Sequence, residues 1–402
     1  MTHRRTFVSG LLLSMAAIAL SPAQAQVAPK GDPIKIGGSL PLTGPLSATG
    51  LIHKLVGEIY VDDLNKRGGL LGRPVEWVLK DDQSKPDLAR TLYEQLITGD
   101  KVDLLIGPYG TGNILSAMGV AQRYSKTLVH HTFGIPSLAK YEQQFLSWPM
   151  GIKPQVTVPN MLLDALEASG QAPKTFAVVS SKFPSVQFVA NGAREELKKR
   201  GLKEVLALEW DFGNRDYGPI AGRLKEANPD LIFAGSLGLE PTQLLDAMKK
   251  IDYQPRWQFY LYPAPGPLAN AAEGKGALSV AVFENHAPFT DSPLAANLVK
   301  TFKERAAKAN LPDTDVETQA ATSFAAWQII EAAVNATKSL DDKKMAEWLR
   351  KNRIDTIVGT LRFDEAGNFG DDLQNIKQVQ NGKWVVVWPA KRAAPNAKLM
   401  TP

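Results

Sequence analysis

The stretch VDLLIGPYGTGN at 102–113 constrains the fold of this chain more than any other part of its sequence. A short apolar run, 102–106, comes before a glycine-rich turn, and an apolar segment with helical spacing follows at 114–121. This order predicts a buried strand, a tight turn and a helix. In an open parallel sheet such a turn lies at the carboxyl end of a strand, where ligands bind, and the first N–H groups of the helix suit a carboxylate or phosphate. An ordinary loop capped by Thr111 or Asn113 is the alternative interpretation.

The same alternation of strand-like and helix-like segments continues along the chain in two runs. The first run covers 34–131, the pattern pauses around Trp148, and the second run covers 158–284. Three more helices are expected near 294–309, 317–336 and 342–351, and a strand-rich end has Asn381-Gly382 as a hairpin turn. These patterns predict the α/β fold class, with two doubly wound halves.

The first 25 residues read as a secretory signal peptide. Arg4 and Arg5 form a basic start, an apolar run follows at 7–20, and Ala23-Gln24-Ala25 is an A-x-A cleavage site. The two arginines also fit twin-arginine export, and a plain basic start is the simpler interpretation. Removal of this segment lowers the formal net charge from +5 to +3. Cysteine is absent, so we expect neither a disulfide nor a lipid anchor, and we predict a periplasmic protein.

Composition and motifs argue against most enzyme classes. The 402 residues are 44% hydrophobic and 22% charged, as in globular proteins, and no basic cluster with interleaved aromatic residues indicates nucleic-acid binding. The glycine pair Gly110-x-Gly112 lacks the third glycine of a dinucleotide fingerprint, and no nucleophile-elbow, zinc-protease or P-loop motif occurs. His130 and His131 are adjacent, so on a strand they point to opposite faces and are poorly placed to chelate one ion. We therefore expect no catalytic residues, no metal and no cofactor.

Several motifs in a fixed order resemble those of periplasmic solute-binding proteins of the branched-chain amino-acid type, which serve ABC importers. The resemblance covers about 34–388. It implies the type I periplasmic-binding-protein fold, with two α/β lobes joined by a three-crossover hinge. The matching motifs are IKIGGSLPLTG at 34–44, NKRGGLLG at 65–72, DDQSKP at 81–86, DKVDLLIGP at 100–108, Asp216-Tyr217, NPDLIF at 228–233, Val358-Gly359 and FDEAG at 363–367.

The resemblance also implies where each lobe begins and ends. Lobe 1 is expected at 33–149 with 284–358, and lobe 2 at 150–283 with 359–392. Independently of the resemblance, the short end segment 393–402 is expected to be a flexible tail. The crossovers are expected near 147–152, 280–284 and 357–360. Closure of the lobes on a ligand, like a hinged clamp, is the implied mechanism.

The ligand contacts of the family correspond to loops of this chain. The turn that holds the ligand carboxylate corresponds to Tyr109, Gly110 and Thr111, with Thr111 donating through its hydroxyl and N–H groups. Further contacts are expected from both lobes, with aromatic members lining the pocket or, alternatively, packing in the core. These residues are Thr49, His131, Thr132 and Phe133 from lobe 1, and Phe183, Leu237 and Tyr262 from lobe 2.

The sequence departs from the family pattern in one loop. Amino-acid-binding members pair the ligand ammonium with an acidic residue that falls within 260–265, and this chain has neither Asp nor Glu there. An unpaired ammonium in a closed cleft is costly, so we expect a small carboxylate with an apolar or aromatic body, unless Glu240 substitutes. His130 or His131 is a further candidate to face the carboxylate.

The expected partners are a small carboxylate and an ABC permease and ATPase complex in the inner membrane, and we expect a monomer. Two other functions stay open at this point. One is a sensory binding protein for a membrane receptor, and the other is a periplasmic hydrolase with His131 as base.

Overall fold

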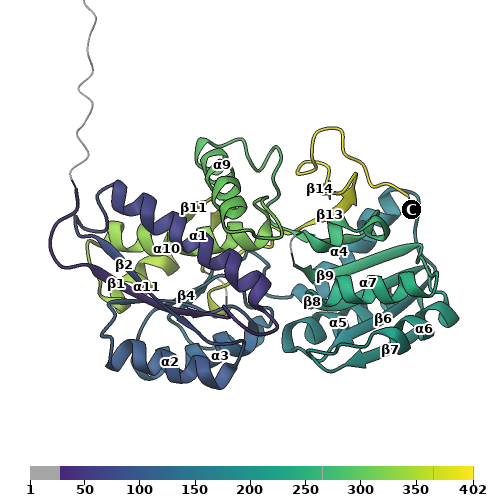
Figure 1. Ribbon diagram of the computed structural model, residues 1–402, viewed down its shortest axis with the longest axis horizontal. Helices are drawn as coiled ribbons and strands as arrows, with labels where there is room; N and C mark the ends of the chain where they lie inside the picture. Colours follow the sequence, from purple (N-terminus) through teal and green to yellow (C-terminus); the bar gives the residue numbers. More distant parts are fainter. Residues whose placement is uncertain (1–27, 265, 365, 402) are drawn as a thin grey trace, which may run out of the picture.

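Two β-sheets, each covered by helices on both faces, make up the computed structural model of this protein (Figure 1). The structure describes residues 28–264, 266–364 and 366–401, so the expected signal peptide lies outside it. The first sheet is parallel throughout, with strand order β2-β1-β3-β4-β5. Its strands are β1 (Ile34–Leu40), β2 (Val75–Asp81), β3 (Leu104–Ile106), β4 (Leu128–His130) and β5 (Gln144–Leu146).

Helices from two distant parts of the sequence cover this first sheet. Helices α2 and α3 pack together on one face, whereas α1 packs against α9 and α10 on the other face (Figure 1). We call this sheet and its helices lobe 1. Its helices are α1 (Ser47–Lys66), α2 (Pro86–Thr98), α3 (Thr111–Arg123), α9 (Pro293–Lys308), α10 (Thr318–Thr337) and α11 (Asp342–Lys351), with the short η1 (Pro136–Leu138).

The second sheet has the order β14-β13-β10-β9-β8-β6-β7. The pairs β10–β13 and β13–β14 are antiparallel, and the other neighbouring strands are parallel. This sheet and its helices form lobe 2, on the right of Figure 1. Its strands are β6 (Thr175–Ser181), β7 (Lys203–Trp210), β8 (Leu231–Gly238), β9 (Trp257–Pro263), β10 (Leu278–Ala281), β13 (Asn375–Gln380) and β14 (Lys383–Trp388).

The helices of lobe 2 also lie on both faces of their sheet. Helices α4 and α5 pack together, and α5 contacts β6 and β8, while α6 and α7 pack together over β7, β8 and β9. The predicted doubly wound α/β class is therefore confirmed. The helices are α4 (Pro154–Ala168), α5 (Pro184–Lys199), α6 (Gly218–Ala227), α7 (Glu240–Lys250), α8 (Pro267–Asn270) and η2 (Ala272–Gly274).

The chain passes between the lobes three times. The first passage follows β5, the second follows β10, and the third lies before β13. The third passage comes later than the expected 357–360. The hairpin of β11 (Ile354–Thr356) and β12 (Gly359–Leu361) contacts α10, and η3 (Ala366–Asn368) lies against β5, so the chain leaves lobe 1 only after residue 368.

The first and third passages run side by side. Met150 and Asp372 form an isolated antiparallel bridge, and the Leu373 N–H donates to the Pro149 carbonyl at 2.9 Å. Two of the three connections therefore act as one short two-stranded hinge.

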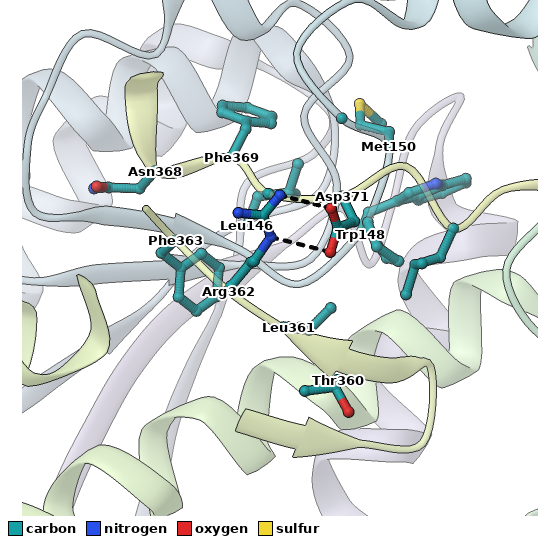
Figure 2. Close-up of a pocket in the computed structure, with 14 residues that line it drawn as sticks. Leu146, Trp148, Met150, Thr360, Leu361, Arg362, Phe363, Asn368, Phe369 and Asp371 are labelled. Atoms are coloured by element: carbon teal, nitrogen blue, oxygen red, sulfur yellow. Dashed lines mark hydrogen bonds and ion pairs between the residues drawn. The ribbon is translucent and has the colours of Figure 1, made fainter. Parts of the chain in front are cut away.

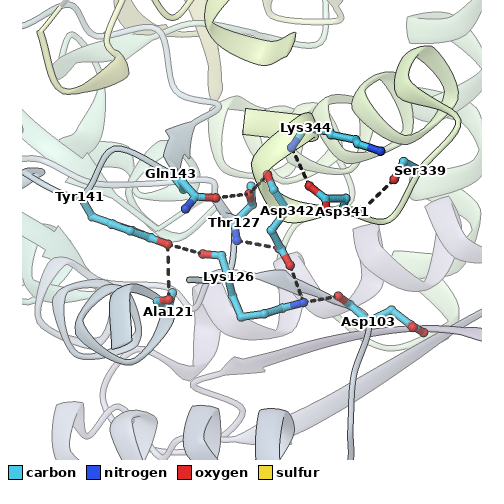
Figure 3. A network of polar contacts seen from close by, with 10 residues as sticks. All are labelled: Asp103, Ala121, Lys126, Thr127, Tyr141, Gln143, Ser339, Asp341, Asp342 and Lys344. Carbon is cyan, nitrogen blue, oxygen red and sulfur yellow. Dashed lines mark hydrogen bonds and ion pairs between the residues drawn. The ribbon is translucent and has the colours of Figure 1, made fainter. Parts of the chain in front are cut away.

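A partly buried polar network holds the late helix α11 to lobe 1 (Figure 3). Lys126 Nζ lies 2.7 Å from Asp342 Oδ2 and donates to the Asp103 carbonyl at 2.5 Å. The Thr127 N–H donates to Asp342 Oδ1 at 2.7 Å. Asp342 thus joins the start of α11 to the turn before β4.

The segment expected as a frayed tail is docked on lobe 2. Gln378, on β13, exchanges two hydrogen bonds with the backbone of Met400, at 2.8 and 2.9 Å, and Gln380 donates to the Lys398 carbonyl at 2.7 Å. Leu399 also packs against the hydrophobic core. Apolar residues of the end segment and two glutamines of β13 provide these contacts. The expectation of a flexible tail is therefore wrong for 393–401.

Candidate functional site

The two sheets turn corresponding ends toward each other. In lobe 1 the strand order reverses between β1 and β3, because β2 lies on one side of β1 and β3 on the other. In lobe 2 the order reverses in the same way between β6 and β8. Ligands of doubly wound sheets bind at this switch point, outside the carboxyl ends of the strands. The turn after β3, the loop after β6 and the end of β8 therefore mark the candidate site.

A cavity lies between the lobes at this place. None of the described residues that line it carries a formal charge, and its walls are aromatic, apolar or hydroxyl-bearing. The lining residues are Tyr109, Gly110, Thr111, Thr132, Phe133, Gly134, Trp148, Met150, Phe183, Ser185, Leu237, Tyr262 and Gln319.

The turn after β3 brings the start of α3 to the cavity. Gly110 has φ of 93°, a left-handed conformation that favours glycine, and Thr111 is the first residue of α3. The Gly134 N–H donates to Thr111 Oγ1 at 3.4 Å, which ties the turn to the loop after β4. The first N–H groups of α3 therefore face the cavity from lobe 1, where they favour a negative group.

Lobe 2 closes the cavity from the opposite side. Phe183 and Ser185 stand at the N-terminus of α5, and Leu237 and Tyr262 are paired neighbours on β8 and β9. A Cβ atom added to Gly134 would lie 2.4 Å from the Ser185 Cβ, so the two lobes already touch at the rim. This contact is the signature of a closed arrangement.

Two expected site residues lie behind the cavity wall instead of in it. Thr49 is buried and hydrogen bonds to the Tyr109 side chain. His131 stacks on His53 with ring centroids 4.0 Å apart, and both rings lie beside Tyr109. Thr49 and His131 therefore support Tyr109 and do not line the cavity.

The buried histidines are neutral near pH 7. Burial lowers the pKa of His53 to about 3 and that of His130 to about 4. Burial, followed by the neighbouring His53 and His130, lowers the pKa of His131 well below its usual value. His130 Nε2 also lies 2.7 Å from Gln144 Oε1, away from the cavity lining. A histidine cation facing the ligand is therefore excluded.

Glu240 is occupied within lobe 2 and does not line the cavity. Ser181 Oγ and Trp210 Nε1 both donate to its Oε1 at 2.9 Å, and the Leu237 N–H donates to its Oε2 at 3.2 Å. Burial raises the pKa of its carboxyl, and these donors oppose that rise. Glu240, the candidate to replace the acidic residue missing from 260–265, thus already has its hydrogen-bond partners within lobe 2.

Among the lining residues that sequence reasoning missed are Trp148, Met150, Ser185 and Gln319. Trp148 and Met150 lie in the first passage, where the loss of alternation marked a break but indicated no side-chain direction. Gln319 is in the first turn of α10, and helical periodicity carries no signal for such a position.

A neighbouring hollow lies between β5 and the third passage (Figure 2). Its cation, Arg362, makes two hydrogen bonds to Asp371, at 2.7 and 3.0 Å, and its Nη1 contacts Asp364 at 2.9 Å. In Figure 2, Trp148 and Met150 lie on the opposite side of this hollow from Phe363 and Asn368. Because its arginine is already ion-paired, this hollow is a poor site for an anionic ligand.

The part of the chain that the structure describes holds no cluster of three or more histidine, cysteine or acidic side chains suited to a metal ion. Within the same residues no helix combines the length and hydrophobicity needed to span a bilayer.

A family model described as periplasmic binding protein matches residues 33–383. The chain belongs to this family. The family is one of binding proteins, so the expectation that the chain is not an enzyme is confirmed. A relative, Leu/Ile/Val-binding protein homolog 3 of Brucella melitensis biotype 1, is 26% identical over 363 residues, which cover 88% of this chain and 93% of the relative.

Solved structures of periplasmic binding proteins share the fold. A leucine-binding protein from Thermotoga maritima matches with a TM-score of 0.75 and 20% identity, covering 88% of this chain and 97% of its own. A solute-binding protein of an ABC transporter from R. palustris, in complex with benzoate, matches with a TM-score of 0.76 and 18% identity, covering 92% and 99%. These structures confirm the predicted type I periplasmic-binding-protein fold. The Leu/Ile/Val-binding relative is consistent with the resemblance to the branched-chain amino-acid type.

Proposed function

We propose that this protein is the substrate-binding component of an ABC importer. It captures a small carboxylate with an aromatic or apolar body and delivers it, as a periplasmic monomer, to a permease and ATPase complex in the inner membrane. The observation that carries this proposal is an uncharged cavity between the two lobes, walled by the aromatic residues Tyr109, Phe133, Phe183 and Tyr262. Pockets of this kind bind small ligands through apolar contact and a few polar groups.

The carboxylate is assigned to the end of the cavity at Thr111, which we call the helix end. The start of α3 offers backbone N–H groups and the Thr111 hydroxyl, and Ser185 adds a second hydroxyl from the start of α5. Helix N-termini attract anions through their aligned peptide dipoles. A carboxylate held here needs no lysine or arginine, which agrees with the absence of charge among the described lining residues.

The same absence of charge argues against an α-amino acid. No described acidic side chain lines the cavity, and Glu240 already accepts three hydrogen bonds within lobe 2. A buried ammonium without a partner costs several kcal/mol. An aromatic ring, in contrast, gains about 0.5–1.5 kcal/mol from each well-placed aromatic neighbour beyond its burial.

Isothermal titration calorimetry with two ligand sets tests this proposal. Benzoate, phenylacetate and cinnamate form the set without an ammonium, and leucine, valine and phenylalanine form the amino-acid set. We expect the first set to bind at least about a hundredfold more tightly, because ~3 kcal/mol corresponds to about two factors of ten. Tight binding of leucine or valine, with no binding by the first set, would overturn the proposal.

A further inference from the structure

The cavity contains more hydrogen-bonding groups than a carboxylate with a plain hydrocarbon body would bind. Trp148 Nε1, Tyr262 OH and Gln319 Oε1 are buried atoms of lining residues, and none of them makes a well-formed hydrogen bond among the described residues, although the Gln319 side chain also interacts with His53. Trp148 and Gln319 are each 4% exposed. Buried polar groups in proteins are normally paired, so an unpaired set around a cavity indicates that a ligand supplies the partner.

These three groups lie apart from the helix end. Thr111 and Ser185 are joined through Gly134, which hydrogen bonds to Thr111 and touches Ser185. Trp148 instead packs edge-on against Tyr262, with ring centroids 5.4 Å apart. Trp148 belongs to the first passage between the lobes, and its neighbour Ser147 donates to the Thr322 carbonyl of α10, one turn beyond Gln319. We call this part of the cavity the hinge end.

The chemistry of the three groups selects what can occupy the hinge end. An indole N–H only donates, an amide oxygen only accepts, and a phenol hydroxyl does both. A ligand group that both accepts and donates therefore suits all three. A neutral hydroxyl does so, whereas a second carboxylate would bring a charge to a place where no described cation lines the wall.

We propose that Trp148, Tyr262 and Gln319 form a hydroxyl-binding subsite at the hinge end, which selects aromatic carboxylates that carry a hydroxyl group opposite the carboxylate. This inference rests on the proposed function, since it requires the carboxylate at the helix end. It adds a second polar anchor, so the ligand spans the cavity from the start of α3 to the hinge. Occupancy of this subsite then brings the ligand into direct contact with the first passage.

Matched ligands of nearly equal shape test the subsite in the intact protein. Titration calorimetry compares 4-hydroxybenzoate with 4-methylbenzoate, which replaces the hydroxyl by a methyl group of similar size, and with benzene-1,4-dicarboxylate. We expect 4-hydroxybenzoate to bind at least tenfold more tightly than either. Equal affinity for the hydroxyl and methyl compounds would overturn the subsite and leave the proposed function standing. Tightest binding by the dicarboxylate would also overturn it. If none of these compounds or benzoate binds, the proposed function itself fails, and the subsite with it.

Variants then assign the preference to its residues. In Tyr262→Phe and in Trp148→Phe we expect the affinity ratio of 4-hydroxybenzoate to 4-methylbenzoate to fall toward one. Tyr253→Phe is the matched control, because the Tyr253 hydroxyl is also buried and unpartnered among the described residues but lies outside the cavity lining. A ratio that stays at its original value in both cavity variants would show that the selectivity arises elsewhere. The ratio is read within each variant, so a general loss of stability does not mimic the effect.

Discussion

At the scale of single residues, Thr111 has the clearest assigned role. Its hydroxyl oxygen accepts the Gly134 N–H at 3.4 Å, which leaves the hydroxyl hydrogen available for a ligand carboxylate. Thr111→Val keeps the shape and removes the hydroxyl. A hydrogen bond to a charged group contributes about 1.5–3 kcal/mol, so we expect benzoate affinity to fall about tenfold or more in a calorimetric titration. Thr111→Ser is the control that keeps the hydroxyl, and equal affinity of the valine variant would refute the assignment.

The neutral histidines predict a specific pH effect on stability. The folded-state pKa of His130, about 4, is below the usual histidine pKa of 6.5, so the stabilising contribution of His130 is present above pH 6.5 and is lost as the pH falls toward 4. The wild type should thus lose ~2 kcal/mol on this account between pH 7 and pH 5. In urea unfolding, the stability gap between wild type and His130→Gln should narrow by that amount.

Comparison of the two proteins at each pH is needed because buried acids act in the opposite sense. Burial raises the pKa of Glu317 to about 8, so its contribution is fully present below pH 4.5 and is lost as the pH rises through 8. A gap between wild type and His130→Gln that is constant from pH 7 to pH 5 would contradict the assignment of His130 as a buried neutral group.

The candidate site shows how far residue positions follow from sequence. The turn at Tyr109, Gly110 and Thr111 was predictable because strand, glycine and helix signals meet there. Whether a side chain lines the cavity or lies behind its wall was not predictable, since Thr49 and His131 are on the expected elements but lie behind Tyr109. Depth depends on how distant segments pack, and one sequence carries no local pattern for it.

At the scale of elements, a buried ion pair joins the second passage to lobe 2. Lys377 on β13 lies 2.6 Å from Glu284 Oε1 and 3.8 Å from Glu317 Oε2, which is in the residue that caps α10. The three side chains are 4–6% exposed. This cluster therefore connects β13, the second passage and the start of α10.

Removal of the lysine should be strongly destabilising. Lys377→Met keeps most of the apolar stem but leaves Glu284 buried without its cation. Breaking a buried pair costs about 3–5 kcal/mol, so urea unfolding at pH 7 should show a loss of that size. Lys383→Met, at an exposed position on β14, is the control and should change stability by less than about 0.5 kcal/mol. A small effect of Lys377→Met would mean that the cluster contributes little.

Most elements were predictable because their periodicity extends over whole helices or over strands with clear turns. The strand β5 (Gln144–Leu146) was not, since it holds only two apolar residues and no helix of lobe 1 follows it directly. The third passage was expected too early because its place at 357–360 came from the resemblance. In the structure η3 is held to β5 by Asn368, which donates to the Glu142 and Gln144 carbonyls at 2.7 and 2.9 Å.

At the scale of the whole molecule, contact between the lobes should limit ligand affinity. Gly134→Ala adds a Cβ atom that would lie 2.4 Å from the Ser185 Cβ, and Gly134 has no positive φ that would forbid alanine. We expect the variant to fold but to resist closure, with weaker binding of benzoate and a larger radius of gyration in small-angle scattering at saturating ligand.

Gly119→Ala, at an exposed position with open space around the added atom, is the control and should behave like the wild type. Closure itself would be contradicted if Gly134→Ala bound benzoate as tightly as the wild type and showed the same radius of gyration.

The paired first and third passages have a consequence for the proposed importer as a whole. Trp148 and Met150 line the cavity, and Met150 is bridged to Asp372, so one short segment both lines the proposed ligand site and connects the lobes. Thermodynamic linkage then makes the two events reciprocal. A membrane partner that binds the open form more tightly must lower the affinity for the ligand, and the ligand must lower the affinity for the partner by the same factor. Binding to the membrane partner can therefore promote release of the ligand. Titration of the ligand in the presence and absence of the membrane complex would measure this factor as a ratio of dissociation constants.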